Sequence, residues 1–133
     1  PYGTFNQQKI IGVKMGKLEN YNQLLNCLMY GKNNAVSAKH LAGNFEVTNL
    51  LEFKRKVRSL AHAARSNGHW IIGDSRGYYV ALHRAEWESY KKQRLVAINN
   101  ELKAIANCDN ISFADLIKTV YGITPTDKNY ELF

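Results

Sequence analysis

Four polar side chains in the stretch FKRKVRSLAHAARS recur at a spacing that lets them contact nucleic acid together. On a helix that advances about 100° per residue, one side carries Arg55, Arg58, Ser59 and His62. The arginine fork fits the O6 and N7 acceptors of guanine, whereas a lysine ammonium meets phosphate as a point charge. The spacing predicts a helix face that contacts duplex DNA, flanked by Lys54 and Lys56. A basic face that only meets solvent is the alternative.

The positive charge of the chain is concentrated around this face. The 133 residues carry a net charge of +7. Residues 54–94 contain ten Lys or Arg and three Asp or Glu, so this segment holds the whole excess. Localised positive charge is typical of a surface that binds a polyanion.

The helix that must position the basic face has an apolar stripe on its opposite side. The stripe follows the i, i+4, i+7, i+8, i+11 spacing of a core-facing helix and consists of Phe53, Val57, Leu60, Ala61 and Ala64. Gly68 is expected to end the helix, with Arg65 in its last turn. The segment 46–51 reads as the preceding turn, and the helix is expected to open at Thr48 or Glu52.

A β-hairpin is predicted directly after this helix. The runs 70–72 and 78–81 are rich in β-forming residues and flank the loop Gly73–Gly77. Ser75 and Arg76 at its tip are expected to reach a phosphate or a neighbouring minor groove. Arg84, just beyond the hairpin, is expected to contact phosphate. An exposed turn arginine without such a role is the alternative for Arg76.

The loop also matches G-x-S-x-G, the pattern of a serine hydrolase elbow, with Ser75 as the nucleophile. That elbow needs a strand before the serine and a helix after it, whereas a second strand follows here. His40, His62, His69 and His83 show no metal-ligand spacing, and neither cysteine belongs to a CxxC pair. We therefore expect no enzyme and no metal site, with Cys27 and Cys108 as buried free thiols.

Other helices are expected around this core. Apolar spacing predicts a helix over 18–30, and Ser37 is a good N-cap for a short helix over 38–44, in which Leu41 and Phe45 face inward. A long helix is expected over 84–107, and Ser112 caps a last helix that ends at Tyr121 before Gly122.

The long helix carries a heptad seam whose first position is polar. The seam consists of Lys91, Leu95, Ile98, Leu102 and Ile105. It predicts either a homodimer through this helix or packing within the chain. Trp87 and Tyr90 are expected to pack on the hairpin domain.

These elements predict a mostly helical α+β fold: a winged helix-turn-helix with a two-stranded wing and a long C-terminal helix. Three regions are expected, an N-terminal arm over 1–16, the winged domain over 17–83, and a dimerisation or partner region over 84–133. No apolar run approaches the roughly 18 residues of a membrane span, and no signal peptide opens the chain. The expected location is therefore the cytoplasm.

The pattern R-x-V-R at 55–58, the basic helix end before Gly68, the strand Trp70–Ile72 and the strand Gly77–Ala81 resemble a known family. It comprises small winged-helix proteins of phage and prophage replication or regulatory modules in Gram-positive bacteria. The resemblance covers about residues 18–106 and implies duplex DNA binding in a bacterial host cell, without a cofactor. The turn over 46–51 is longer and more apolar than the family pattern. An interaction adaptor for helicase loading or DNA packaging is the alternative.

Overall fold

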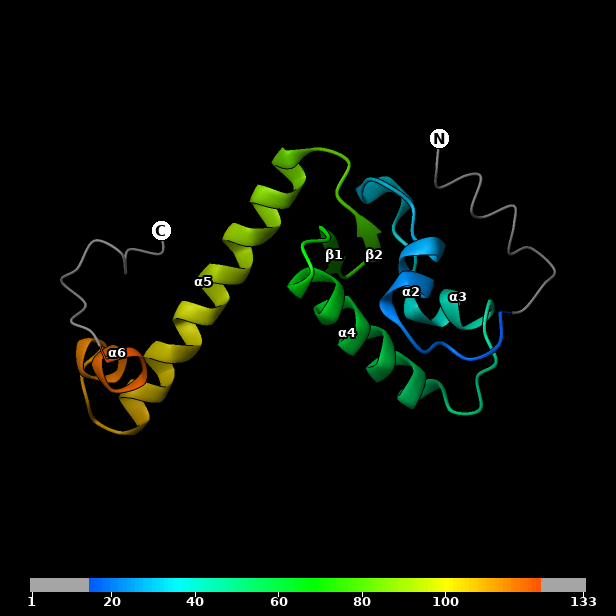
Figure 1. Cartoon of the computed structure of the whole chain (residues 1–133). Coiled ribbons are helices and arrows are strands. Elements are labelled where there is room, and N and C mark those ends of the chain that lie inside the picture. The colour runs from blue at the N-terminus through cyan, green and yellow to red at the C-terminus, as the bar shows by residue number, and fades with distance from the viewer. Residues whose placement is uncertain (1–14, 123–133) are drawn as a thin grey trace. The chain divides into compact units, whose positions relative to one another are not determined.

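The computed structural model describes residues 15–122, and most of these residues lie in helices (Figure 1). The chain divides after Trp87 into two compact units. The expected mostly helical α+β class is confirmed, with several helices, one antiparallel hairpin and then a long helix. The predicted N-terminal arm falls almost wholly outside the described residues, as does the tail beyond Gly122.

The first helix, α2 (Tyr21–Cys27), is shorter than the predicted span of 18–30. Asn20 sets its start, because the Asn20 side chain accepts a 3.0 Å hydrogen bond from the Gln23 N–H and the Gln23 side chain accepts one from the Asn20 N–H. Leu28 is already extended at the other end. The chain leaves the helix there because the next residues bond to the hairpin.

A 3₁₀ turn, η1 (Lys32–Asn34), leads to the short helix α3 (Ala38–Ala42). Ser37 caps α3 as predicted, and its Oγ accepts a 3.0 Å hydrogen bond from the His40 N–H. The helix ends two residues before the expected Asn44, because the chain turns at Gly43. Leu41 and Phe45 are buried as predicted.

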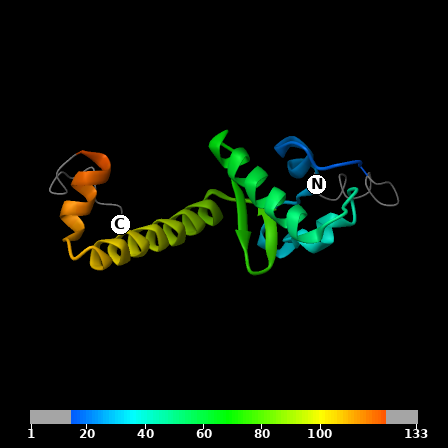
Figure 2. The same cartoon turned by 90° about the horizontal axis from the view of Figure 1, so that it is seen from below.

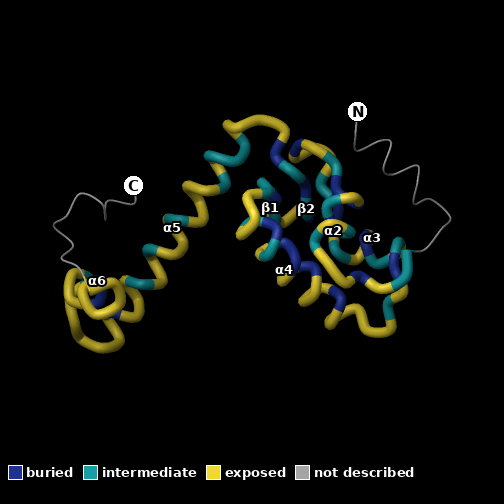
Figure 3. Tube along the Cα trace, in the orientation of Figure 1, coloured by how far each residue is buried: buried dark blue, intermediate teal, exposed yellow. Residues whose placement is uncertain are grey.

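Helix α4 (Leu50–Ser66) carries the predicted apolar stripe, and all five stripe residues are buried (Figure 3). The helix was expected to open at Thr48 or Glu52, and both positions are wrong. Asn49 is the N-cap, because the Asn49 Oδ1 accepts a 3.1 Å hydrogen bond from the Glu52 N–H. Leu50 and Leu51 are therefore helical and do not belong to the preceding turn. At the other end Gly68, with φ of 88°, turns the chain so that the His69 N–H reaches the Ala64 carbonyl.

Strands β1 (Ile71–Asp74) and β2 (Gly77–Val80) form the predicted hairpin, with Ile71 opposite Val80 and Asp74 opposite Gly77. The connecting turn is Ser75-Arg76, which is shorter than the predicted loop 73–77. The other three residues of that loop, Gly73, Asp74 and Gly77, pair within the strands instead. Tyr79 is buried and Tyr78 is half-buried, because successive side chains of a strand point to opposite faces.

The segment between α2 and α3 bonds to the free edge of β2, which the sequence did not predict. Val36 exchanges two backbone hydrogen bonds with Tyr78, of 2.9 and 2.8 Å. The Gly31 N–H donates to the Val80 carbonyl, and the Val80 N–H donates to Met29. The strand β2 therefore lies between β1 and this segment, which fixes the hairpin to the helices.

The core of the first unit gathers side chains from α2, α3, α4 and β1. The rings of Phe45 and Phe53 lie 5.9 Å apart between centroids, which joins the turn after α3 to the first turns of α4. Figure 2 shows this unit from below, with α4 beside the hairpin. Because its stripe is anchored on several elements, α4 presents its other side outward.

Helix α5 (Arg84–Cys108) matches the predicted long helix to within one residue. In the second unit, α6 (Phe113–Tyr121) begins after the predicted cap Ser112 and ends at Gly122. Ala106, Leu116 and Ile117 are buried where α5 and α6 meet. Along the predicted seam, Leu95 and Leu102 are half-buried whereas Ile98 and Ile105 are exposed. Within residues 15–122, no helix is both long enough and apolar enough to cross a bilayer.

Candidate nucleic-acid interface

The outer side of α4 brings six of the nine predicted contact residues onto one helix. All six are exposed: Lys54, Arg55, Lys56, Arg58, Ser59 and His62. The buried stripe on the other side fixes the rotation of the helix, so these side chains point away from the core. The helix is 17 residues long, or about 25 Å at 1.5 Å per residue. A rod of that size fits a DNA major groove.

The four cations on the outer side of α4 form no ion pair with the residues that the structure describes. Among residues 15–122, no carboxylate forms a salt bridge with Lys54, Arg55, Lys56 or Arg58. Only Glu52 adds negative charge to the helix itself, in its first turn. This side of α4 therefore carries a positive charge that is available to a partner.

Arg65 differs from the other basic residues of α4. Its Nε donates a 2.7 Å hydrogen bond to the Ile71 carbonyl oxygen, and the side chain is partly buried. The sequence predicted only that Arg65 lies in the last turn of the helix, where a cation complements the helix dipole. The structure gives it a further role, since it connects the end of α4 to the start of β1.

The two predicted hairpin residues, Ser75 and Arg76, form the turn, but Arg76 is already paired. The Arg76 guanidinium lies 3.2 Å from one oxygen of the Asp74 carboxylate. The backbone N–H of Arg76 donates a 2.8 Å hydrogen bond to the other oxygen. More than half of the Arg76 side chain stays exposed. The ion pair orients the arginine at the tip and offsets its charge.

Arg76 also lines a shallow pocket of about 430 Å³ next to α3, together with Ser37 and His40. Lys39 and His40 are exposed on α3, and sequence reasoning gave them no role. Lys39 and His40 directly follow the Ser37 cap, and this place in the first turn of a helix was the sequence feature that could have drawn attention to them. Arg76 thus pairs with Asp74 in the hairpin and borders the hollow next to α3.

Arg84, the ninth predicted residue, lies over an aromatic pair at the start of α5. The rings of Trp70 and Trp87 are stacked with planes 2° apart and centroids 6.0 Å apart. The Arg84 guanidinium carbon is 5.9 Å from the Trp70 ring centroid. Trp87 therefore packs on the hairpin domain as expected, and Arg84 is held beside the hairpin base.

Glu86 secures the same junction. Its carboxylate accepts hydrogen bonds from the Leu82 N–H at 2.7 Å and the Lys32 N–H at 3.2 Å. Partial desolvation acts to raise the pKa of Glu86, but these backbone hydrogen bonds and the nearby His83 outweigh it and lower the pKa below its usual range. The carboxylate thus stays charged at neutral pH and ties η1 to the start of α5.

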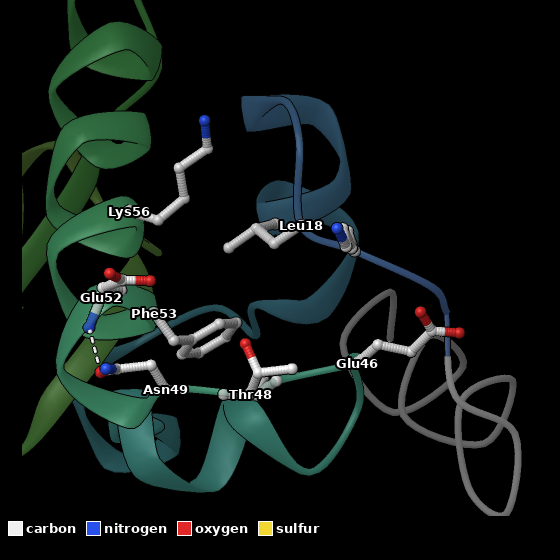
Figure 4. Close-up of a pocket in the computed structure, with 9 residues that line it drawn as sticks. Leu18, Glu46, Thr48, Asn49, Glu52, Phe53 and Lys56 are labelled. Atoms are coloured by element: carbon white, nitrogen blue, oxygen red, sulfur yellow. Dashed lines mark hydrogen bonds between the residues drawn. The ribbon is translucent and has the colours of Figure 1, made fainter.

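A second hollow, of about 320 Å³, opens at the start of α4 (Figure 4). Phe53 and Leu18 supply its apolar part, while Lys56, Glu52 and Glu46 stand at its edge. The charges around it are mixed in sign. This arrangement offers no paired acid and base and no concentrated charge, so the exposed side of α4 is the stronger candidate site.

The two glycines of the G-x-S-x-G match are explained by packing. A Cβ on Gly77 would lie 2.4 Å from the backbone of Val36, and a Cβ on Gly73 would lie 2.9 Å from the Tyr78 ring. Gly77 also has φ of 129°. Strand β2 follows Ser75, where a nucleophile elbow would need a helix. The pattern therefore reflects a tight hairpin against a neighbouring segment.

Among residues 15–122, no group of three His, Cys, Asp or Glu side chains could hold a metal. Both cysteines are free, but only Cys27 is buried; the expectation was wrong for Cys108, which is exposed. Burial raises the pKa of the Cys27 thiol to about 11, so it stays protonated.

No protein-family model, no curated protein and no solved structure matches this chain. The family resemblance of the sequence therefore stays a prediction.

Proposed function

We propose that this chain binds duplex DNA with a sequence preference, using α4 as the recognition helix of a winged helix-turn-helix. The observation that carries the proposal is the outer side of α4, where four cations without a salt bridge to any described residue lie opposite a buried stripe. Such a helix suits the major groove, where phosphates flank base edges. The element order supports the same assignment, since the α-helices α2, α3 and α4 precede the hairpin within residues 15–122.

The roles divide by chemistry and position. Lys54 and Lys56, at the sides of the outer face, contact phosphates, together with Arg76 and Arg84 near the hairpin. Arg55, Arg58, Ser59 and His62 read base edges from the middle of the face. Ser75 lies at the wing tip and accompanies Arg76. The biological setting implied by the resemblance is a phage or prophage module for replication or transcription control.

Replacement of Arg55 and Arg58 tests the proposal. The double variant Arg55→Ala, Arg58→Ala is expected to weaken duplex binding by about 1–3 kcal/mol for each arginine that reads a base. The matched control, Lys92→Ala with Arg94→Ala, removes the same charge from exposed positions of α5. A folded Arg55/Arg58 variant that binds selected duplexes like the wild type would overturn the proposal.

A second candidate is an interaction adaptor for helicase loading or DNA packaging, in which the second unit is the active surface. The favouring observation is exposed apolar surface there, on Ile105, Val120 and Tyr121.

Homodimerisation through α5 would use the exposed Ile98 and Ile105 of the seam. Sedimentation analysis of the wild type and an Ile98→Lys, Ile105→Lys variant separates a dimer from a monomer. A protein partner bound tightly without any duplex binding would favour the adaptor.

A further inference from the structure

One apolar side chain stands in the row of polar residues on the outer side of α4. Leu51 precedes Arg55 by four residues, Arg58 by seven and His62 by eleven. On a helix these separations place all four side chains within about 60° of one another around the axis. The row therefore begins with an aliphatic side chain and continues with cations.

The Leu51 side chain is not part of the core. It is 56% exposed, whereas Phe53 and Val57 on the other side of α4 are buried. A single exposed leucine is ordinary on a protein surface, but this one has a specific place. It lies in the first turn of α4, and the N-terminal residues of a recognition helix are those that reach base edges.

The major groove presents one apolar group, the C5 methyl of thymine, beside polar donors and acceptors. An aliphatic side chain gains by covering that methyl group. Against the other base edges, the same side chain would desolvate donors or acceptors without offering them a hydrogen bond. Leu51 therefore discriminates by chemistry that the arginines of the row do not have.

Resting on the proposed function, we propose that Leu51 reads a pyrimidine C5 methyl group in the major groove, next to the bases contacted by Arg55 and Arg58. The methyl group belongs to thymine or to 5-methylcytosine. Sequence reasoning passed over Leu51 because the segment 46–51 was assigned to the turn before the helix. Because Asn49 is the N-cap, Leu51 lies within α4, on the same side of the helix as Arg55, Arg58 and His62.

The probe is a set of duplexes selected by the wild-type protein from a random pool, in which each thymine is then replaced in turn by uracil. This exchange removes one methyl group and leaves the base pair unchanged. The wild type is expected to lose about fourfold in affinity at one thymine position, the amount that one buried methyl contributes. The Leu51→Ala variant is expected to bind the thymine and uracil duplexes equally.

Two further arms complete the experiment. In the first, the affinities of duplexes with cytosine and with 5-methylcytosine at the sensitive position are compared. Higher affinity with 5-methylcytosine means that the methyl group alone is read, whereas equal affinity means that thymine is read. Leu82→Ala is the matched control, because Leu82 is also 56% exposed and lies outside α4. This variant is expected to keep the discrimination between thymine and uracil, and both variants should melt like the wild type.

The inference is overturned if uracil has no effect at any position, or if Leu51→Ala still discriminates. It is also overturned if the pool yields bound duplexes without a shared sequence, because no base is then read. Failure of the wild type to bind any duplex contradicts the proposed function itself, which is a different result.

Discussion

The Arg65 Nε donates a 2.7 Å hydrogen bond to the Ile71 carbonyl oxygen, which joins the last turn of α4 to the first residue of β1. Arg65 therefore stabilises the angle between the helix and the hairpin, while Arg58 on the same helix points outward. Two arginines seven residues apart thus have separate roles, one in folding and one in the proposed binding.

Replacement of each arginine separates these roles. Arg65→Ala is expected to lower the free energy of unfolding by about 1.5–3 kcal/mol, because a partly buried charged hydrogen bond is lost. Arg58→Ala is expected to change stability by less than about 0.5 kcal/mol and to weaken duplex binding. Urea denaturation and fluorescence anisotropy measure the two quantities. Equal loss of stability in both variants would contradict the assignment.

The close approach of Gly77 to Val36 predicts a large effect of a single methyl group. Gly77→Ala places a Cβ 2.4 Å from the Val36 backbone at φ of 129°, so it is expected to destabilise the protein by about 3 kcal/mol or more. Gly68→Ala is the matched control: φ is also positive, at 88°, but beyond the adjoining residues no atom of the described chain lies within 4 Å of the added Cβ. The expected loss of stability is about 1–2 kcal/mol. Thermal unfolding compares them, and equal losses would show that the contact with Val36 is unimportant.

The buried thiol of Cys27 predicts alkaline destabilisation. Below about pH 8.5 the thiol is protonated in both the folded and the unfolded chain. At higher pH the unfolded chain loses this proton, whereas the folded protein keeps it up to a pKa of about 11. Stability is therefore complete at neutral pH and falls by about 3 kcal/mol as the pH rises through that window.

Denaturation at pH 7 to 11 measures this effect. Cys27→Ala is expected to flatten the alkaline decline, and Cys108→Ala, at an exposed position, is expected to leave it unchanged. A decline of the same slope in all three proteins would assign it to other groups.

The ion pair at the hairpin tip predicts that Asp74 restrains DNA binding. Asp74→Asn removes a carboxylate 3.2 Å from the Arg76 guanidinium, and this exposed pair contributes at most about 1 kcal/mol to stability. Duplex affinity is expected to rise, because Arg76 gains net charge near the phosphates. Binding titrations of Asp74→Asn beside Asp109→Asn, an exposed acid of the second unit, measure the change. A decrease in affinity for Asp74→Asn would contradict a role for Arg76 at phosphate.

Local patterns predicted the parts of the fold that depend on neighbouring residues. The stripe of α4, the Ser37 and Ser112 caps and the two ends of α5 all follow from periodicity or capping chemistry within one element. The six outer residues of α4 follow from the same periodicity, since burial of one side exposes the other.

Contacts between distant segments could not be predicted in this way. The backbone bonds of Val36 and Gly31 to β2 involve too few residues to leave an alternating pattern. For the same reason the early end of α2 was missed, since Leu28 becomes extended to reach that edge. The partners of Arg65 and Arg76 depend on where the Ile71 carbonyl and the Asp74 carboxylate lie in space. The sequence therefore did not predict that Asp74 partly neutralises the charge of Arg76.

Whether α4 is the DNA-binding surface is tested by the salt dependence of duplex binding. Three proteins are compared: the wild type, the Arg55→Ala, Arg58→Ala variant and the Lys92→Ala, Arg94→Ala control. We expect log K to fall linearly with log salt, with a slope of about −0.9 for each phosphate neutralised. We also expect a larger loss of affinity for the α4 variant than for the control. A flat salt response of the wild type, or equal affinities for all three folded proteins, would contradict the claim that α4 is the DNA-binding surface.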